Sequence, residues 1–413
     1  MQTPRAPVAG ATLIAGALLM GCTSPPLKSV QEGGWVCSVR GARCDVGISL
    51  AVARQVDVLF VVDSSATMAE EQRKLAAAIP ALTRALDRKR AELRVGVTTA
   101  DMGNPRCAGD EYRDPDRGRL VQASCRDRLG PDGDFVFDSL GVAAEFACTD
   151  YCDAGVHAAL QGGLTPTEIY DDDSVAPRPW YEHGVLSNLP AGVVEATAAL
   201  PENNDADPNN DVSPLAAALR CGLPQGVNGC GFESPLESMF WALRRAQEPT
   251  EASFGFLRDA ALLGVALVTD ELDCSFNPAQ ELIFVDLNST WAWEPGAVTP
   301  TSAVCWNAGV VCAGEAPGPY VGCTAADYDI DGALILDGSQ DERAVLYPLA
   351  RYIDELDAIE NYKKMIDQNQ EVFVSLLAGV PEGYAEGAAE LEYRDDDDAE
   401  AHALYGIGPG CDG

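Results

Sequence analysis

The chain has few of the side chains on which most enzyme and nucleic-acid sites depend. It has 3 histidines in 413 residues, and 28 basic residues stand against 64 acidic ones, for a net charge of −36. The Gly-x-Ser-x-Gly, His-Glu-x-x-His and Gly-x4-Gly-Lys-Ser/Thr motifs of hydrolases, zinc proteases and nucleotide-binding proteins are absent. The absent motifs and the scattered histidines lead us to expect no catalytic activity. Because the charge repels phosphate backbones and attracts cations, we expect no nucleic-acid partner.

The N-terminus carries an apolar run that is too short to cross a bilayer. The segment "VAGATLIAGALLMGC" offers about a dozen apolar residues, whereas a spanning helix needs ~20. Its end resembles the lipobox of bacterial lipoproteins, with Cys22 as the lipidated residue. An ordinary signal peptide that ends near a cysteine is the alternative. The resemblance implies a signal peptide over 1–21 and an outer-membrane or cell-surface lipoprotein of a diderm bacterium, because Thr23 rather than aspartate follows the cysteine.

The cysteine content indicates an oxidising compartment. The chain has 14 cysteines, so an odd number remains if Cys22 carries lipid. In exported proteins such a count predicts disulfides. A zinc site is a weak alternative, since no Cys-x-x-Cys pair occurs and the histidines are far apart. Close spacing suggests four pairs: Cys37–Cys44, Cys148–Cys152, Cys221–Cys230 and Cys312–Cys323.

Two buried strands with a helix between them follow a tether predicted over 22–54. The run "VDVLFVV" at 56–62 has one polar residue, and "LRVGVTT" at 93–99 is a second strand candidate. Near-continuous apolar runs are typical of strands buried on both faces of a parallel sheet. Apolar residues recur between them at helical spacing: Leu75, Ile79, Leu82 and Leu86. This order predicts an α/β fold with a doubly wound, mostly parallel sheet flanked by helices.

Regular elements return after a long stretch rich in Gly, Pro, Asp and Cys. Ser234, Pro235 and Glu237 fit the N-cap, first position and third position of a helix, which is a capping box. Further elements are predicted from apolar patterns: helices near 193–200 and 212–219 and within 344–366, and strands within 261–271 and 371–380.

These elements predict one folded domain interrupted by two disulfide-bearing insertions. The boundaries are a domain over 55–380, insertions over about 103–229 and 274–343, and an acidic tail over 381–413. The tail leaves little chain for a last strand and helix, so an incomplete domain is an alternative for this end.

Two of the predicted strands end in aspartate. Asp63 follows the first strand, with Ser65 and Thr67 at alternate positions beyond it, and Asp270 ends a later strand. The carboxyl ends of parallel strands meet at one edge, where such sheets bind ligands. Carboxylates and hydroxyls are hard oxygen ligands, which suit Mg²⁺, Mn²⁺ or Ca²⁺ rather than zinc. The structural alternative makes Asp63 a turn residue and one hydroxyl a helix cap.

The segment "VDVLFVVDSSATMAEEQ" resembles the first strand and metal-ion-dependent adhesion motif of von Willebrand factor A domains, Asp-x-Ser-x-Ser. Asp63 and Ser65 match this motif, Thr67 keeps a hydroxyl, and Asp270 resembles the family's supporting aspartate. The chain is also similar to surface lipoproteins of diderm bacteria, such as myxobacteria, that carry this domain. The resemblance implies a lipid-anchored, non-catalytic protein whose cation binds a protein or matrix ligand through an acidic group.

Glu233 is the one departure from the family pattern. The family has a threonine in a Gly-x-Thr step before a helix, and Gly231-Phe232-Glu233 places a glutamate there. Glu233 either ligates the metal or closes the site against a partner. It could also be an ordinary acidic residue at a helix N-terminus, where negative charge is favourable. The alternative function is therefore a structural envelope lipoprotein whose cations only stabilise the fold; a hydrolase ranks below both, because no nucleophile and base can be named.

A second cation candidate lies in "DYDIDG". Asp327, Asp329 and Asp331 fall at positions 1, 3 and 5 of a calcium loop, with a glycine at the turn. The loop pattern requires a glutamate six residues after that glycine, where this chain has Gly338. An ordinary acidic turn is the alternative.

Overall fold

The chain divides into two compact units. The computed structural model describes residues 36–37, 44–45 and 55–408, with gaps at 109–112, 132, 138–141, 169–174, 208, 287–290, 292–300, 337–341, 382 and 385–386. The larger unit comprises Val52–Gly379 and Tyr393–Gly408, and the smaller one Met1–Ala51, Val380–Glu392 and Pro409–Gly413. In the smaller unit, β1 (Val36–Cys37) pairs antiparallel with β2 (Cys44–Asp45). The predicted lipidation at Cys22 and the side chains of the predicted Cys37–Cys44 pair lie outside the described residues.

A five-stranded sheet forms the centre of the larger unit. Its strand order is β15-β10-β3-β4-β9, in which the first four are parallel and β9 is antiparallel. The strand bounds are β3 Gln55–Val62, β4 Glu92–Thr99, β9 Tyr181–His183, β10 Leu262–Val268 and β15 Val372–Leu377. The predicted mostly parallel sheet flanked by helices is therefore confirmed.

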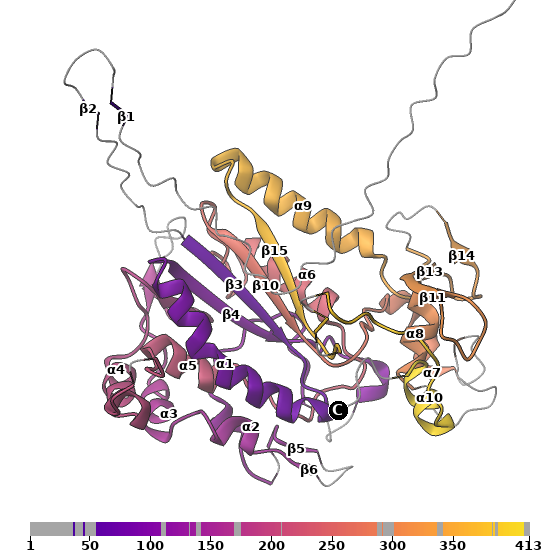
Figure 1. Cartoon of the computed structure of the whole chain (residues 1–413), viewed down its shortest axis with the longest axis horizontal. Helices are drawn as coiled ribbons and strands as arrows, with labels where there is room; N and C mark the ends of the chain where they lie inside the picture. The colour runs from indigo at the N-terminus through magenta and orange to yellow at the C-terminus, as the bar shows by residue number, and fades with distance from the viewer. Residues whose placement is uncertain are drawn as a thin grey trace, which may run out of the picture. The chain divides into compact units, whose positions relative to one another are not determined.

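Helices cover both faces of this sheet. Phe60 and Val62 of β3 belong to one apolar core with residues of α1 and α5, while Leu59 and Val61 belong to another with residues of α6 and α9. Figure 1 shows α1 and α9 on opposite sides of the strands. This double burial explains the near-continuous apolar run of the first strand. The bounds of these helices are α1 Ala69–Asp87, α5 Pro214–Gly222, α6 Pro235–Gln247 and α9 Leu349–Ile366.

The predicted capping box at the start of α6 is wrong. The Ser234 hydroxyl makes no capping hydrogen bond and donates instead to the backbone carbonyl of Cys274 (2.9 Å). The first turn is capped by the loop after β10, because Asp273 Oδ1 accepts from the Leu236 N–H (3.0 Å) and Ser275 Oγ accepts from the N–H of Glu237 (3.0 Å). A contact distant in sequence has replaced the local one.

The first predicted insertion contains regular structure and part of the core. It supplies the edge strand β9 to the central sheet, and its residues Phe135, Leu164 and Val193 belong to the α1-side core. The remaining elements of this region are η2 Pro105–Cys107, η3 Cys125–Arg128, β5 Val136–Phe137, β6 Val142–Ala143, α2 Phe146–Thr149, α3 Ala154–Leu160, β7 Thr167–Glu168, β8 Val175–Ala176, α4 Ala191–Ala198 and η4 Pro201–Asn204. The helices predicted near 193–200 and 212–219 are confirmed as α4 and α5, whereas the edge strand β9 was not predicted.

The second insertion has a small core of its own. Phe284, Trp291 and Val304 are buried together there. Within the predicted tail, residues 393–408 belong to the larger unit and include α10 (Ala399–Tyr405), where the Ala403 carbonyl accepts from the Thr301 hydroxyl (2.6 Å). The other elements are η5 Pro278–Gln280, α7 Leu282–Val285, α8 Ala303–Gly309, β11 Val310–Ala313, β12 Gly322–Ala325, β13 Asp327–Tyr328 and β14 Leu334–Ile335.

Five disulfides join the described cysteines. They are Cys107–Cys230, Cys125–Cys148, Cys152–Cys221, Cys274–Cys305 and Cys312–Cys323. Only the predicted Cys312–Cys323 pair is confirmed, and it spans the β11–β12 hairpin. The predicted Cys148–Cys152 and Cys221–Cys230 pairs are wrong, because helix packing within the first insertion brings more distant cysteines together.

Candidate metal centre

The parallel strands bring several acidic residues to one edge of the sheet. Asp63 follows β3, Asp101 follows β4 and Asp270 follows β10. The Asp63 N–H donates to the Val268 carbonyl at the end of β10 (2.8 Å). From β3 the chain crosses to β4 on one side, whereas the later strands β10 and β15 lie on the other. Parallel sheets bind ligands at the carboxyl ends of strands where the strand order diverges in this way.

The turn after β3 fixes the Asp63 carboxylate. Asp63 is fully buried, and its Oδ1 accepts from the Ser65 N–H (2.8 Å) while its Oδ2 accepts from the Thr269 hydroxyl (2.6 Å). The Ser65 and Thr67 hydroxyl oxygens lie 3.2 Å apart, and Thr67 is exposed. The short turn thus orders one carboxylate and two hydroxyls, which are hard oxygen donors.

Gln72 of α1 locks this turn against the loop that precedes α6. Its Nε2 donates to the carbonyls of Asp63 (2.8 Å) and Gly226 (2.7 Å), and its Oε1 accepts from the N–H groups of Gln225 and Gly226. At Gly229 a Cβ atom would lie 2.1 Å from Ser64 Oγ, so only glycine permits this approach. The loop that leads to Glu233 is therefore held directly beside the turn that follows β3.

Glu233 has a carboxylate with no hydrogen-bond donor. The residue is fully buried, and neither carboxylate oxygen has a partner among the described residues. Its backbone is fixed by a hydrogen bond from the Cys274 N–H (2.6 Å), and the adjacent Ser234 N–H donates to the Ala100 carbonyl (2.9 Å). Burial, and then the negative charge of Asp63, raise the Glu233 pKa well above its usual range. A protonated Glu233 can donate to Asp63, whereas an ionised one requires a cation.

Two further acidic residues, Asp270 and Glu271, lie close enough to Asp63 for their charges to interact. Although part of the Asp270 side chain is exposed, partial desolvation of its carboxyl and the Asp63 charge raise the pKa of Asp270 to about 6, which a hydrogen bond from Thr67 partly opposes. Burial, followed by the charges of Asp63 and Asp270, raises the pKa of Glu271 to about 8. No Lys or Arg is among the main causes of these two shifts or of the Glu233 shift in the described chain. The main influences on these three carboxyl groups are therefore burial and the negative charges of Asp63 and of one another.

The donor set fits a hard divalent cation. Asp270 and Thr67 are exposed, while Asp63, Ser65 and Glu233 are buried, so the candidate ligands extend from solvent into the fold. In the described residues, one set of three His, Cys, Asp or Glu side chains has all its ligand atoms within 4.8 Å of one another: Cys125, Cys148 and Cys152. These cysteines are oxidised, so they offer no thiolate. No three acidic side chains of the described chain bring their oxygens within that distance of one another.

Asp63 links the five predicted residues: it accepts from the Ser65 N–H, and its charge acts on Glu233 and on Asp270, to which Thr67 hydrogen-bonds. The other candidate lies in a different part of the fold. The predicted calcium loop lies in the β13–β14 hairpin, where Asp329 Oδ1 accepts from the N–H groups of Asp331 (3.1 Å) and Ala333 (2.9 Å). This is the geometry of an ordinary turn. Thr269, Glu271 and Asp101 also belong to the strand-end cluster and were not predicted. The sequence signal for Asp101 was present, because "TTAD" ends a strand as "VTD" does.

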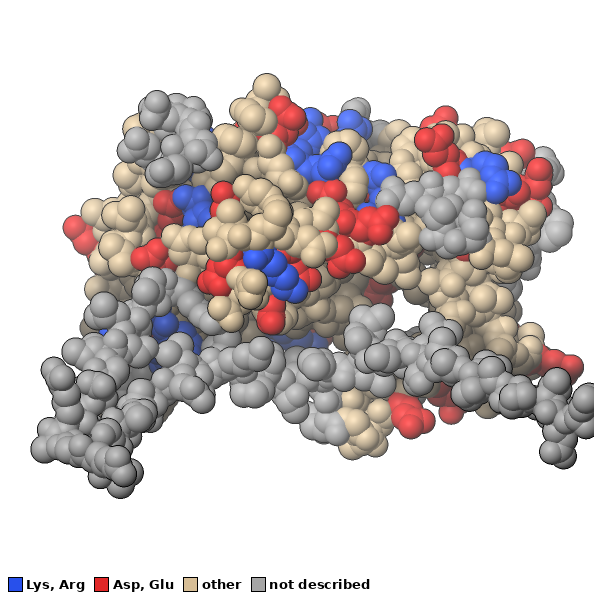
Figure 2. Space-filling view, turned by 90° about the horizontal axis from the view of Figure 1, so that it is seen from above, with Lys and Arg blue, Asp and Glu red and all other residues tan. Residues whose placement is uncertain are grey.

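No protein-family model matches the chain, and no curated protein matches it either. Several disulfides indicate an oxidising, extracellular environment. Within the part of the chain that the structure describes, no helix combines the length and apolar character that a membrane crossing requires. On the face in Figure 2, Lys and Arg side chains lie among Asp and Glu side chains, so the described part of that face presents no continuous basic surface.

Proposed function

We propose that the strand-end cluster binds a divalent cation and, through it, an acidic group of a protein or matrix ligand. The observation that carries this proposal is the Glu233 carboxylate, which is fully buried beside Asp63 with no donor to either oxygen. Burying an ionised carboxylate without a partner is costly, and a bound cation removes that cost. Asp63, Ser65, Thr67 and Asp270 would hold the ion together with Glu233.

The chemistry of the donors favours Mg²⁺, with Mn²⁺ and Ca²⁺ as close alternatives. All the side chains concerned offer carboxylate or hydroxyl oxygens and none offers nitrogen or sulfur. Mg²⁺ retains several waters when protein ligands hold it, and a carboxylate of the ligand can replace one of them. The cation would thus join two acidic surfaces, which is consistent with the charge of −36.

The von Willebrand factor A resemblance supports the same proposal. The Asp63, Ser65, Thr67 motif follows a buried parallel strand, and Asp270 follows its neighbour β10. Glu233 occupies the loop before α6, where the family has a threonine. We propose a non-catalytic adhesion or recognition domain anchored to the cell surface through a lipid on Cys22, with no nucleic-acid partner.

Calorimetry on the soluble domain without its signal peptide tests the cation site. We expect Mg²⁺ to bind the wild type with one ion per chain and to bind Asp63→Ala without detectable heat. The matched control is Asp331→Ala, which removes a carboxylate from the β13–β14 hairpin and should leave binding unchanged. Equal binding by all three proteins would place the cation elsewhere and remove the main support for the proposal.

A purely structural cation is the second candidate, because a buried Glu233 could close the coordination shell. The exposure of Thr67 and Asp270 favours recognition, since it leaves a solvent-facing side. Water-proton relaxation with Mn²⁺ separates the two: an exchangeable water on the ion increases relaxation, and a saturated ion does not. We also expect retention on carboxylate-coated beads with Mg²⁺ and its loss with a chelator, because both surfaces are negative without the ion.

A further inference from the structure

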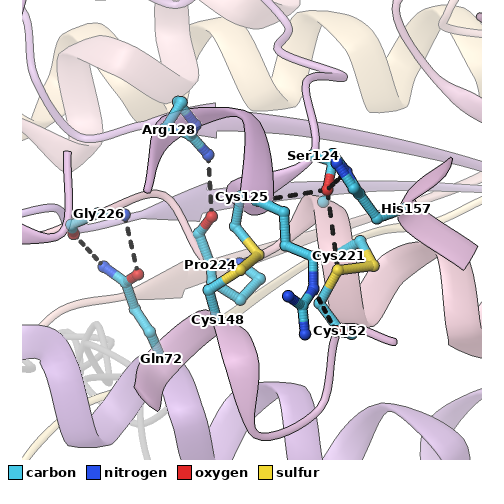
Figure 3. The surroundings of a disulfide bond; sticks show 12 residues. Gln72, Ser124, Cys125, Arg128, Cys148, Cys152, His157, Cys221, Pro224 and Gly226 are labelled. Carbon is cyan, nitrogen blue, oxygen red and sulfur yellow. Dashed lines mark hydrogen bonds between the residues drawn. A yellow bond between two sulfur atoms is a disulfide. The ribbon is translucent and has the colours of Figure 1, made fainter. Parts of the chain in front are cut away.

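Four buried cysteines meet where the helices of the first insertion pack together. Cys125 comes from η3, Cys148 from α2, Cys152 from the turn before α3 and Cys221 from α5, and each is fully buried. They form the Cys125–Cys148 and Cys152–Cys221 disulfides, which lie side by side in Figure 3. The sulfur atoms of Cys125, Cys148 and Cys152 all lie within 4.8 Å of one another. Two independent disulfides therefore share one sulfur-rich pocket of the core.

We propose that, in the reduced chain, these four cysteines form a binding site for a thiophilic cation such as Zn²⁺. Four cysteine thiolates arranged tetrahedrally are a common structural zinc site, with Zn–S bonds of about 2.3 Å. Three of the four sulfurs, those of Cys125, Cys148 and Cys152, already lie within 4.8 Å of one another, and the fourth, that of Cys221, is bonded to the Cys152 sulfur. This site is separate from the strand-end cluster, whose oxygen donors favour a hard cation.

The chemistry balances with a dithiol as the reductant. Each protein disulfide accepts two electrons and two protons from one dithiol, which becomes a disulfide, and two cysteine thiols result. Zn²⁺ then displaces the four thiol protons into solvent as four Zn–S bonds form. The complex carries a net charge of −2, so nearby positive charge would stabilise it.

Basic and polar groups surround the cluster in a chain that has few basic residues. Arg126 donates from Nε to the Cys152 carbonyl (2.6 Å), and the Ser124 hydroxyl lies 3.7 Å from the Cys152 sulfur. His157 Nδ1 lies 3.0 Å from Ser124 Oγ. Arginine and histidine near a cysteine favour the thiolate form, which is the form that binds metal.

Two more arginines flank the cluster through an aromatic ring. Arg73 and Arg220 both lie over the ring of Tyr151, at 5.7 and 5.3 Å from its centroid, and each also forms an ion pair with an acidic side chain. Tyr151 precedes Cys152, and Arg220 precedes Cys221. The two sites differ in their ligand atoms, which are sulfur here and oxygen in the strand-end cluster.

The elements that carry these cysteines also pack against one another through other buried side chains. The helix α5 is buried along its whole length and packs against α1 and α3. The Cys152 N–H donates to the Cys148 carbonyl (2.9 Å), which fixes these two residues as neighbours on one helical turn. The other three described disulfides have no second disulfide in such a group, so they serve as internal controls.

Alkylation protection in the full-length protein, without its signal peptide, tests the proposal directly. The chain is reduced with a phosphine, incubated with or without Zn²⁺, treated briefly with iodoacetamide and mapped by peptide mass spectrometry. We expect Zn²⁺ to protect Cys125, Cys148, Cys152 and Cys221. The cysteines of the β11–β12 hairpin, Cys312 and Cys323, should remain reactive. Equal reactivity with and without Zn²⁺, or protection of other cysteines only, would overturn the proposal.

Cobalt spectroscopy gives a second readout with matched variants. The reduced wild type should give the charge-transfer and intense d–d absorption of tetrahedral Co²⁺ bound by thiolates, at one ion per chain. Cys312→Ser with Cys323→Ser should keep these bands, whereas Cys125→Ser with Cys148→Ser should lose them. A Cys125/Cys148 variant that keeps the full spectrum would show that the metal binds elsewhere. Wild-type protection in the alkylation experiment does not depend on whether either variant folds.

Discussion

The strand β3 carries a fully buried aspartate near its start and another just after its end, and the fold treats them differently. Asp57 accepts hydrogen bonds from the backbone N–H (2.7 Å) and the Nε (2.8 Å) of Arg258, and Lys363 adds further positive charge. Asp63, ~20 Å further along, receives hydrogen bonds from neutral groups only and faces Glu233, Asp270 and Glu271. Arg258 neutralises the carboxylate of Asp57, whereas no arginine of the described chain hydrogen-bonds to the carboxylate of Asp63.

The difference separates a structural carboxylate from a candidate binding carboxylate. A buried acid that serves the fold requires a permanent counter-ion, which Arg258 supplies to Asp57. Four clustered acids without a basic partner leave that role to a proton or to a cation from solution. The chain has only 28 basic residues, and none of those described is among the main causes of the pKa shifts of Glu233, Asp270 and Glu271.

Removing the charge of Asp57 should have the largest effect on the free energy of unfolding. Asp57→Asn leaves the Arg258 charge buried without its partner, so we expect a loss of about 3–5 kcal/mol in the free energy of unfolding. Urea unfolding should show the same loss with and without Mg²⁺. A loss below about 1 kcal/mol would mean that solvent, and not Asp57, neutralises Arg258.

Glu233→Gln should lower the free energy of unfolding only when Mg²⁺ is present. With Mg²⁺ at a hundred times its Kd, the wild type should gain about 2.7 kcal/mol in the free energy of unfolding, and the variant should gain almost none. Without metal the variant should be at least as stable as the wild type, because the amide can donate to Asp63. Loss of stability without metal would instead indicate that protein groups already satisfy Glu233.

The metal-free protein should become less stable as pH rises. The pKa of Glu271 is about 8 in the folded state, against an ordinary value of 4.5 in the unfolded chain. Between pH 4.5 and 8 the folded state therefore binds more protons than the unfolded state, so its stability falls as the pH rises. Solvent screening at this partly exposed group limits the fall to the order of 1 kcal/mol. Unfolding curves at pH 5 to 8 should show it, and saturating Mg²⁺ or Glu271→Gln should flatten it. A rise in stability with pH would contradict the assigned shift.

The smallest effect is expected in the β13–β14 hairpin. Asp331→Asn changes an acidic residue outside the strand-end cluster, so we expect less than about 0.5 kcal/mol on stability. Thermal unfolding with Ca²⁺ and Mg²⁺ should show the same metal response as the wild type. If the Ca²⁺ response disappears in this variant, the hairpin and not the strand-end cluster holds that ion.

Much of the sheet and of the strand-end cluster could be predicted from the sequence, because both depend on local patterns. The apolar runs identify β3, β4, β10 and β15, and parallel pairing then brings Asp63 and Asp270 to one edge. Glu233 was found only through the motif resemblance, since its own neighbourhood does not indicate burial. That no described group donates a hydrogen bond to its carboxylate depends on how the fold packs and cannot be read from the sequence.

The errors come from contacts between distant segments. Ser234 and Glu237 looked like a local cap, but Glu237 pairs with Arg351 of α9 (2.9 Å) and the cap comes from Asp273 and Ser275. Cysteine spacing failed for the same reason, because helix packing rather than proximity in sequence selects the partners of Cys148 and Cys221. Such contacts depend on the whole fold.

The disulfides of the first insertion close the chain into covalent rings. Cys107 and Cys230 are 123 residues apart in the sequence, and Cys152 and Cys221 are 69 residues apart. Val185 and Leu186 lie inside both rings and are 79% and 78% exposed. A protease that cut between them would release neither fragment, because both rings span the break. On the outside of a cell, such a nicked molecule would keep the Glu233 loop attached and would separate into two polypeptides only after reduction.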